Sequence, residues 1–239
     1  MMMKPLASAL LLCATFAAHA AGPTIRQLDG KKLPIGDADS LARRVLSENH
    51  VTGAAIAVLN DGQLAWISGY GERDTQLHLP MQPDTTTWAA SITKSVFATY
   101  VMQLAQQGVV PLDTPIVQLL PRPLNEYAAY KDSAAELVSD PRYKTITPRM
   151  LLAHTSGLAN FAAYEPDKKM HLHFDPGTRF AYSGEGINLL QLIVEQRMNQ
   201  PLQQQMETAF FTPLRMTATS LVWNPAFGSN VADRYDADG

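Results

Sequence analysis

The spacing of apolar and polar positions changes along the chain and predicts an α+β fold. Residues 37–49 have apolar positions at helical spacing, with Asp37 or Asp39 available as an N-cap. Residues 53–70 then form two apolar runs of β-forming residues around an Asn-Asp-Gly turn at 60–62. An Asp-Gly pair tolerates positive φ, so this segment predicts a β-hairpin.

Helical periodicity dominates the rest of the chain after a polar, proline-containing loop at 72–87. The predicted helices cover residues 91–108, 111–121, 147–157 and 187–198, with another helix after Pro201. For the third of these, Thr147 is the expected N-cap, Pro148 the first helical residue and Gly157 the stop. Residues 122–146 form a polar, Tyr-rich stretch, and no internal repeat is visible. Helices therefore greatly outnumber strands, with one convincing hairpin.

Composition narrows the class of partner. The chain has 239 residues, a net charge of −3 and 46% hydrophobic residues, which is typical of a globular protein. Its 19 basic residues form no block, so nothing indicates a nucleic-acid or polybasic membrane surface. We expect a small-molecule partner and make no prediction of the oligomeric state.

The first twenty residues have the pattern of a secretory signal peptide. Lys4 precedes a short apolar core at 6–16, and Ala18-His19-Ala20 supplies a small-x-small cleavage site. The apolar core is too short to span a bilayer. We expect cleavage after Ala20, a domain over residues 21–239, and a periplasmic or secreted protein with no membrane anchor.

Cysteine usage fits the same compartment. Cys13 is the only cysteine, so the processed chain would have none and no disulfide. A lipoprotein would use Cys13 as its anchor, but bulky Leu12 stands where a lipobox requires a small residue.

The segment "SITK" at 91–94 contains the strongest candidate chemistry. Positions three apart on a helix lie on one face, about 5 to 6 Å apart at Cβ, so Lys94 can approach the Ser91 hydroxyl. Ser91 would lie at the first turn, where the helix dipole favours a developing negative charge. Alternatively, Ser91 only caps the helix and Lys94 is a solvated surface residue.

Metal and cofactor patterns give weaker signals. His171 and His173 could present two imidazoles on one face of a strand, as a metal site would. No other ligand cluster stands at a suitable spacing, so we predict no metal. The sequence has no Walker loop, dinucleotide fingerprint, G-x-S-x-G elbow or H-E-x-x-H motif, and we predict no cofactor.

Three segments together resemble the serine β-lactamase and penicillin-binding-protein-like hydrolases. They are "SITK" at 91–94, "LLAHTSGL" at 151–158 and "PGTRFAYSGEGINLLQL" at 176–192, and the resemblance covers roughly residues 36–225. It is strongest to the branch that holds class C β-lactamases, D-Ala-D-Ala carboxypeptidases and esterases. The resemblance implies a β-lactamase/transpeptidase-like fold, with a helical lobe beside an antiparallel-sheet lobe.

The resemblance also implies roles for individual residues. Ser91 would be the acylated nucleophile, Lys94 its neighbouring proton acceptor and Tyr182 the second acid/base group, acting on a small or peptide-like substrate. His154 would be a hydrogen-bonded support. Either a neutral Lys94 or a Tyr182 phenolate held by charged Lys94 could take the serine proton, and the sequence does not choose between them.

The residues after Tyr182 depart from the family pattern. The family often has Tyr-x-Asn, whereas this chain has Tyr182-Ser183-Gly184 and no carboxamide to hold a substrate amide. Ser183 and Gly184 are the expected substrate-binding positions, with Ser183 or Glu185 as alternatives that fill the space. The missing carboxamide favours an esterase-like hydrolase over a dedicated β-lactamase or peptidase.

The family's third motif, a Lys or His followed by Ser/Thr or another residue and then Gly on a strand, is not found after Tyr182. We therefore expect residues 21–239 to be the N-terminal portion of a longer hydrolase, or a truncated product, with an incomplete sheet. Alone, such a chain would be poorly folded and nearly inactive. Three hypotheses remain: a serine hydrolase acting on amide, β-lactam or ester bonds, a non-catalytic relative that binds peptidoglycan-like ligands, and a secreted domain in which the S-x-x-K pattern is accidental.

Overall fold

A computed structural model describes residues 23–235, which form two compact units. The first, here called the sheet unit, comprises the chain up to Thr85 and the segment from Asn230 onward, and the second, the helical unit, is Thr86–Ser229. The chain returns to the sheet unit at its end, where the Thr85 hydroxyl donates to Asn230 Oδ1 at 2.9 Å. The predicted signal peptide, residues 1–20, lies outside the described residues.

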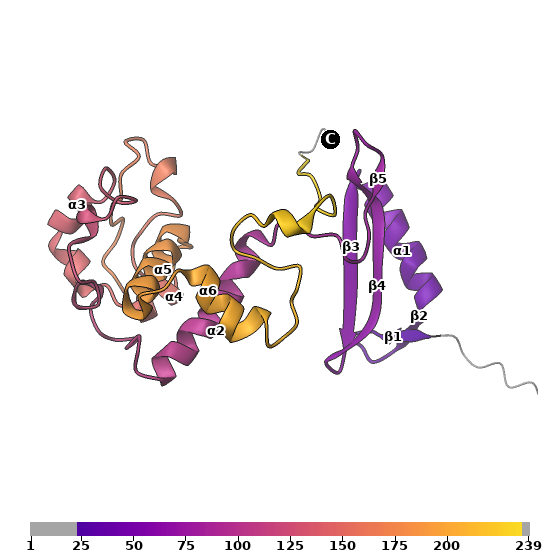
Figure 1. The fold of residues 1–239 in the computed structure, drawn as a ribbon, viewed down its shortest axis with the longest axis horizontal. Helices are drawn as coiled ribbons and strands as arrows, with labels where there is room; N and C mark the ends of the chain where they lie inside the picture. Colours follow the sequence, from indigo (N-terminus) through magenta and orange to yellow (C-terminus); the bar gives the residue numbers. More distant parts are fainter. Residues whose placement is uncertain (1–22, 236–239) are drawn as a thin grey trace, which may run out of the picture. The chain divides into compact units, whose positions relative to one another are not determined.

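A β-hairpin forms the centre of the sheet unit (Figure 1). Strands β3 (Gly53–Asn60) and β4 (Gln63–Asp74) are antiparallel and are joined by Asp61 and Gly62, whose φ angles are 51° and 73°. These positive angles at both turn residues match the sharp hairpin turn expected from the Asp-Gly pair. The hairpin prediction is confirmed.

Short strands extend the sheet unit beyond the hairpin. Strand β5 (Leu79–Pro80) pairs with β4, giving the order β3-β4-β5. Strands β1 (Thr24–Arg26) and β2 (Lys32–Pro34) form a separate two-stranded sheet. The expectation of a loop throughout 72–87 is therefore wrong at the end of β4 and at β5.

Helix α1 (Ile35–Glu48) packs on the hairpin through Tyr70. The Tyr70 hydroxyl donates to Asp39 Oδ1 at 2.9 Å, and the Arg43 guanidinium lies 5.2 Å from the centroid of the same ring. Asp39 is thus used against the sheet and in an ion pair with Arg43. The predicted side-chain N-cap is wrong, because Pro34 occupies the N-cap position with no side-chain hydrogen bond.

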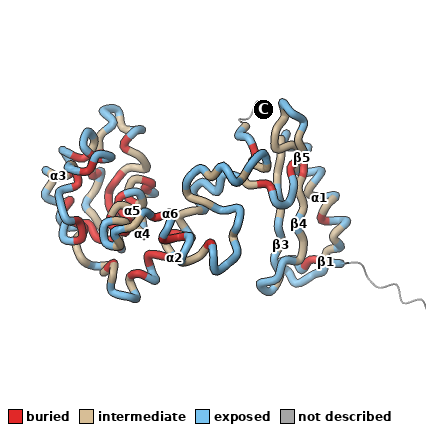
Figure 2. The backbone as a smooth tube through the Cα atoms, viewed as in Figure 1, coloured by how far each residue is buried: buried red, intermediate tan, exposed pale blue. Residues whose placement is uncertain are grey.

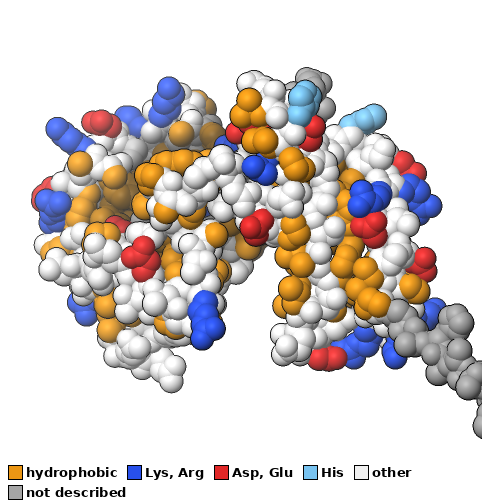
Figure 3. Space-filling model, turned by 45° about the vertical axis from the view of Figure 1, so that its right-hand side comes forward, with side chains coloured by type: hydrophobic (Ala, Val, Ile, Leu, Met, Phe, Trp, Pro, Cys, Tyr) orange, Lys and Arg blue, Asp and Glu red, His pale blue; other side chains and the backbone are white. Residues whose placement is uncertain are grey.

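The opposite face of the hairpin is exposed. Along β3, Ala55, Ala57 and Leu59 are exposed, whereas the residues between them are partly covered. Leu59 is 63% exposed and Ile67 on β4 is 40% exposed, and apolar side chains are visible on the surface of this unit in Figure 3. Among residues 23–235, β3 pairs with β4 alone. The expected incomplete antiparallel sheet is confirmed.

Two long helices, α2 (Thr93–Gln106) and α5 (Gly184–Met198), contribute much of the core of the helical unit. Helix α5 buries Leu189, Leu190, Ile193 and Val194 completely (Figure 2). The shorter elements are α3 (Ala135–Ser139), α4 (Pro148–Leu152), α6 (Leu202–Met206) and a π-helical turn at Glu207–Phe211. Single 3₁₀ turns occupy Ala90–Ile92, Ile116–Gln118, Leu124–Glu126, Pro141–Thr145, Ala162–Tyr164 and Pro225–Phe227.

Some sequence-based boundaries in the helical unit are confirmed and others are corrected. The Thr147 side chain caps α4 by accepting from the Met150 N–H, as predicted. Helix α4 nevertheless ends at Leu152, well before Gly157, because His154 adopts the left-handed conformation with φ 56°. The helix expected over 111–121 is only a 3₁₀ turn.

The stretch 122–146 is more deeply built into the core than its polar composition suggests. Its tyrosines Tyr127, Tyr130 and Tyr143 are buried, together with Leu124 and Leu137. Tyrosine combines a large apolar ring with one polar atom, so a Tyr-rich sequence can read as polar while it fills a core.

No helix among residues 23–235 combines the length and the apolar character that crossing a bilayer requires.

Candidate active site

Ser91 lies in the 3₁₀ turn Ala90–Ile92, immediately before α2. Ala90 has a positive φ of 44°, a sparsely populated conformation for a residue with a side chain. Such local strain often occurs at functional sites. The Ser91 side chain is exposed at the start of α2, where the helix dipole is positive.

Lys94 is in the first turn of α2 and reaches back to the serine. Its Nζ donates to Ser91 Oγ at 3.1 Å, the contact that an i, i+3 spacing allows. No carboxylate in residues 23–235 pairs with this amine. Its nearest partners are therefore hydroxyl groups.

Tyr182 completes the cluster from a position 91 residues later in the chain. Its hydroxyl donates to Ser91 Oγ at 2.9 Å, and Lys94 Nζ lies 5.3 Å from the centroid of its ring. The segment before α5 is fixed by the Ala181 N–H, which donates to the His154 carbonyl oxygen at 2.9 Å. The structure thus brings together the three residues that the sequence indicated as catalytic.

The surroundings of Tyr182 favour its ionised form. Hydrogen bonding to Ser91 lowers the pKa of Tyr182, and hydrogen bonding to Lys94 together with its charge lowers the pKa further. When the phenol is ionised, its oxygen becomes the acceptor and the Ser91 hydroxyl becomes the donor. The geometry is then that of a base bound to a nucleophile.

Burial at the cluster is partial. Ser91 is exposed, Tyr182 is 42% exposed and Lys94 is half-buried. Lys94 is therefore not deeply buried at this site. Hydrogen bonds and charge, which act on Tyr182, are the forces that the observed geometry provides.

His154 supports Tyr182 from behind. The two rings have centroids 4.6 Å apart, and Phe180 packs edge-on to the His154 ring at 5.9 Å. The Ser183 N–H donates to His154 Nδ1 at 3.1 Å, so a neutral ring carries its proton on Nε2. Burial lowers the pKa of His154, and the nearby charge of Lys94 lowers it as well. A neutral ring held on both sides matches the support role implied by the resemblance.

Ser183 and Gly184, the expected substrate-binding residues, are built into the scaffold instead. Ser183 is fully buried, and its hydroxyl donates to the Ala159 carbonyl at 2.7 Å and accepts from the Gly186 N–H as the N-cap of α5. The Gly184 N–H donates to Asn160 Oδ1 at 2.9 Å. The Ser183 hydroxyl is fully buried and donates its proton to the Ala159 carbonyl oxygen, so the structure does not present it to a substrate.

Gly184 and Glu185 are closed in by the neighbouring loop. A Cβ at Gly184 would lie 2.6 Å from the Phe161 ring and 2.9 Å from the Asn160 carbonyl oxygen. The Glu185 carboxylate accepts from the Ala162 N–H at 3.0 Å, so it does not fill a substrate-facing space as the alternative proposed. Phe161 packing on Gly184 is a feature that the sequence pattern did not indicate.

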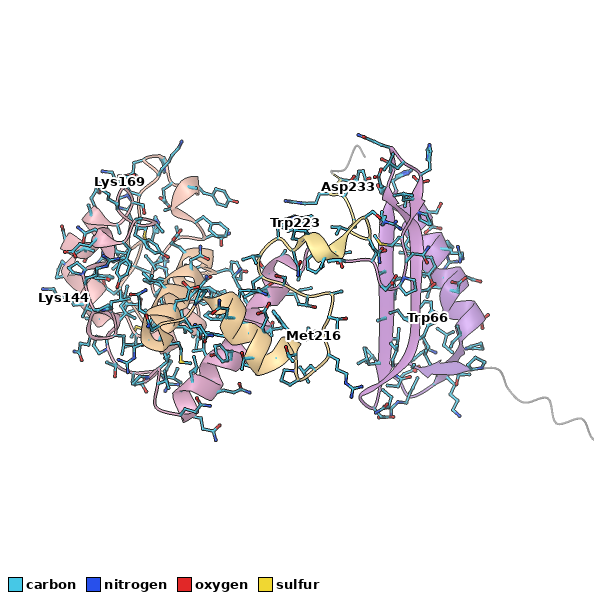
Figure 4. All side chains as sticks on the ribbon, viewed as in Figure 1. Trp66, Lys144, Lys169, Met216, Trp223 and Asp233 are labelled. Carbon is cyan, nitrogen blue, oxygen red and sulfur yellow. The ribbon has the colours of Figure 1, made fainter. Side chains whose placement is uncertain are left out.

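The two histidines considered as metal ligands contact different carboxylates. His171 Nε2 lies 2.8 Å from Asp167 Oδ2, and His173 Nε2 lies 3.1 Å from Glu165 Oε1. Glu136, Asp167 and His171 bring ligand atoms within 4.8 Å of one another, a group that the sequence spacing did not indicate. Lys169, labelled in Figure 4, pairs with Glu136, which makes the group an exposed ion-pair network.

Comparison with known proteins gives matches along most of the chain. Residues 38–239 match the family described as Beta-lactamase. Protein flp of Staphylococcus aureus (strain MRSA252) is 26% identical over 216 residues, which cover 84% of this chain and 41% of that protein.

Two solved structures share the fold. A penicillin-binding protein homologue from Pyrococcus abyssi, which is octameric, aligns with a TM-score of 0.67 and 24% identity, over 84% of this chain and 47% of that one. The D-alanine carboxypeptidase AmpC from Burkholderia cenocepacia aligns with the same TM-score and identity, over 84% of this chain and 55% of that one. The chain thus spans about half the length of the proteins it matches.

Proposed function

We propose that this chain, which belongs to the β-lactamase family, forms an acyl-enzyme on Ser91. Its family supports placing it among the serine hydrolases. The observation that carries the proposal is the position of the Ser91 hydroxyl, which lies 3.1 Å from Lys94 Nζ and 2.9 Å from the Tyr182 hydroxyl. A nucleophile within hydrogen-bond reach of a base and a charged group is the arrangement that nucleophilic catalysis requires.

Acylation begins when the ionised Tyr182 oxygen accepts the proton of Ser91. The Ser91 Oγ then attacks the substrate carbonyl carbon, and a tetrahedral intermediate forms whose oxyanion lies near the positive end of α2. As the bond to the leaving group breaks, Tyr182 returns the proton to that group. Water repeats the sequence on the acyl-enzyme, which releases a carboxylic acid and restores the Ser91 hydroxyl.

Tyr182 is the proposed base and Lys94 the positioning cation. The lowered pKa of Tyr182 favours this division. A charged Lys94 holds the phenolate and Ser91 together through one amine, which can donate three hydrogen bonds.

Esters are the proposed substrate class. Gly184 stands two residues after Tyr182, where the family often has an asparagine, and the space beside it is taken by Phe161, so this position has no carboxamide to bind a substrate amide. An enzyme without that contact lacks a means of favouring amides over esters, and activated esters are intrinsically easier to cleave.

Hydrolysis of p-nitrophenyl acetate beside a chromogenic cephalosporin tests the proposal. We expect the ester to be cleaved faster, and Ser91→Ala to abolish cleavage of both substrates. The matched control is Ser95→Ala, an exposed serine of α2 whose side chain makes no hydrogen bond among the described residues. Reversible ligand binding with no cleavage would support the non-catalytic alternative instead.

We also propose that the protein is exported, on the basis of residues 1–20 alone. Intact mass of the protein recovered from the periplasm or medium should correspond to a chain that begins at Ala21. An unprocessed chain retained in the cytoplasm would contradict this.

A further inference from the structure

A cavity of about 310 Å³ lies within the helical unit, beside the catalytic cluster. Its wall includes Ala90, which directly precedes Ser91, and Lys94, which donates to the Ser91 hydroxyl, together with Thr93. The remaining walls come from α5, from the start of α6 and from the segment at Leu221 and Val222. A volume of about this size is at the small end of the range for ligand pockets.

The lining of this cavity suits an uncharged, mainly apolar group. Apolar side chains such as Leu202 and Val222 form much of the wall. The only ionisable side chains in it are Lys94 and Glu195, one cation and one anion. Both already have partners, because Lys94 is bonded to Ser91 and Glu195 Oε1 accepts from the Leu202 N–H and the Gln191 side chain. A charged ligand of either sign would meet one like charge and one opposite charge in this wall, so the lining favours neither sign.

Two polar groups in the wall remain available to a ligand. The Asn188 amide and the Thr93 hydroxyl line the cavity, and neither side chain makes a hydrogen bond to any of residues 23–235. Both lie on helices that fix their positions, α5 and α2. They can bind a single carbonyl or hydroxyl group on an otherwise apolar ligand.

Tyr182 does not line the cavity, and this decides which half of a substrate enters it. In the proposed reaction Tyr182 returns the proton to the leaving group, so the leaving group must lie on the side of Tyr182. The cavity beside Lys94 then remains for the acyl group, which stays bonded to Ser91 until water displaces it.

We propose that this cavity is the acyl-binding pocket and that it accepts a short, uncharged, predominantly aliphatic acyl chain. The inference rests on the proposed function. In the step concerned, Ser91 Oγ bonds to the acyl carbon, the bond to the alcohol oxygen breaks, and the alcohol leaves with the serine proton while the acyl chain occupies the cavity.

The test compares p-nitrophenyl acetate with p-nitrophenyl hexanoate in two pocket-filling variants. Val222 is 59% exposed and lines the cavity, so Val222→Trp should fill the cavity from an accessible edge. The next residue, Trp223, is labelled in Figure 4. We expect kcat/KM for the hexanoate to fall about tenfold or more relative to the acetate, since the contacts of even one methylene are worth about that factor. Asn188→Trp, which enters from the α5 wall, should give the same selective loss.

Val117→Trp is the matched control, since Val117 lies in the 3₁₀ turn Ile116–Gln118 outside the cavity and is 38% exposed. It should leave the ratio of the two esters unchanged, and thermal unfolding of each variant checks that it is folded. An equal change for both esters in the pocket variants, or a loss that follows the size of the alcohol instead of the acid, would overturn the pocket. If the wild-type protein cleaves neither ester, the proposed function itself fails.

Discussion

At the residue scale, the cluster depends on one tyrosine whose environment favours ionisation. Ser91 and Lys94 lower the pKa of Tyr182 below its ordinary value near 10. Because only the ionised phenol can accept the serine proton, the acylation rate should rise with pH through this pKa and level off above it. The rising limb therefore lies below pH 10.

Removal of Lys94 should move that limb. Lys94→Ala deletes a hydrogen bond and a positive charge that both lower the pKa of Tyr182, so the limb should shift to higher pH. The rate at neutral pH should fall about 10²- to 10⁴-fold, the usual contribution of a positioned acid/base group. The measurement is the pH dependence of the rate of labelling by a fluorophosphonate, which requires only the nucleophile and its base. A limb that stays in place would assign the base role to another group.

In this cluster, contacts between residues close in sequence could be predicted, whereas contacts between distant segments could not. The spacing of Ser91 and Lys94 was sufficient to predict their contact. The assignment of Tyr182 to this cluster depended on the family resemblance, because a contact between residues 91 positions apart is set by tertiary packing. Ser183 could not be assigned correctly, since a serine that caps a helix and a serine that binds substrate have the same sequence signature.

At the element scale, the start of α5 holds the segment that carries Tyr182. Ser183 caps this helix and also bonds to the Ala159 carbonyl, while Asn160 accepts from the Gly184 N–H. The cap thus links α5 to the loop after α4, the same loop region to which His154 belongs. The position of the Tyr182 hydroxyl depends on these hydrogen bonds between α5 and the loop.

Ser183→Ala should weaken the contact between α5 and the loop after α4 and should lower the free energy of unfolding. Loss of an N-cap costs about 1 kcal/mol, and leaving the partly buried Ala159 carbonyl without this partner adds to that cost. Chemical denaturation should show the loss as a lower midpoint. Ser139→Ala is the control, because that hydroxyl lies on the exposed side of short α3 and bonds only to the Ala135 carbonyl within its own helix. Equal midpoints for the two variants would contradict the role of the cap.

Sequence patterns located elements better than they located helix ends. The hairpin and the Thr147 cap follow from local turn and capping chemistry, and both were predictable. The N-terminus of α1 was not, because Asp39 bonds to Tyr70 on a different element. The tyrosines of 122–146 were misread for a similar reason, since their burial depends on contacts made by the whole helical unit.

At the scale of the whole molecule, the sheet unit has one covered and one exposed face. Leu59 points to the exposed face of the hairpin, whereas its neighbour Val58 lies on the face toward α1. Exposed apolar faces and unpaired strand edges promote association between chains. Self-association through this face is what we expect of the 239-residue chain at high concentration.

A lysine should have different effects on the exposed face of the hairpin and on the face toward α1. Leu59→Lys should reduce concentration-dependent light scattering with little change in stability, because the side chain is 63% exposed. Val58→Lys should lower the unfolding midpoint, since it places a charge against α1. Scattering that is unaffected by Leu59→Lys would show that this face does not drive association.

The central claim is that Ser91 is the acylated nucleophile. Incubation with a fluorophosphonate, followed by intact mass and peptide mapping, tests it most directly. The account predicts a single adduct on Ser91, formed more slowly in Lys94→Ala and not formed in Ser91→Ala. A wild-type protein that stays unmodified, or an adduct that maps to any other residue, would contradict it.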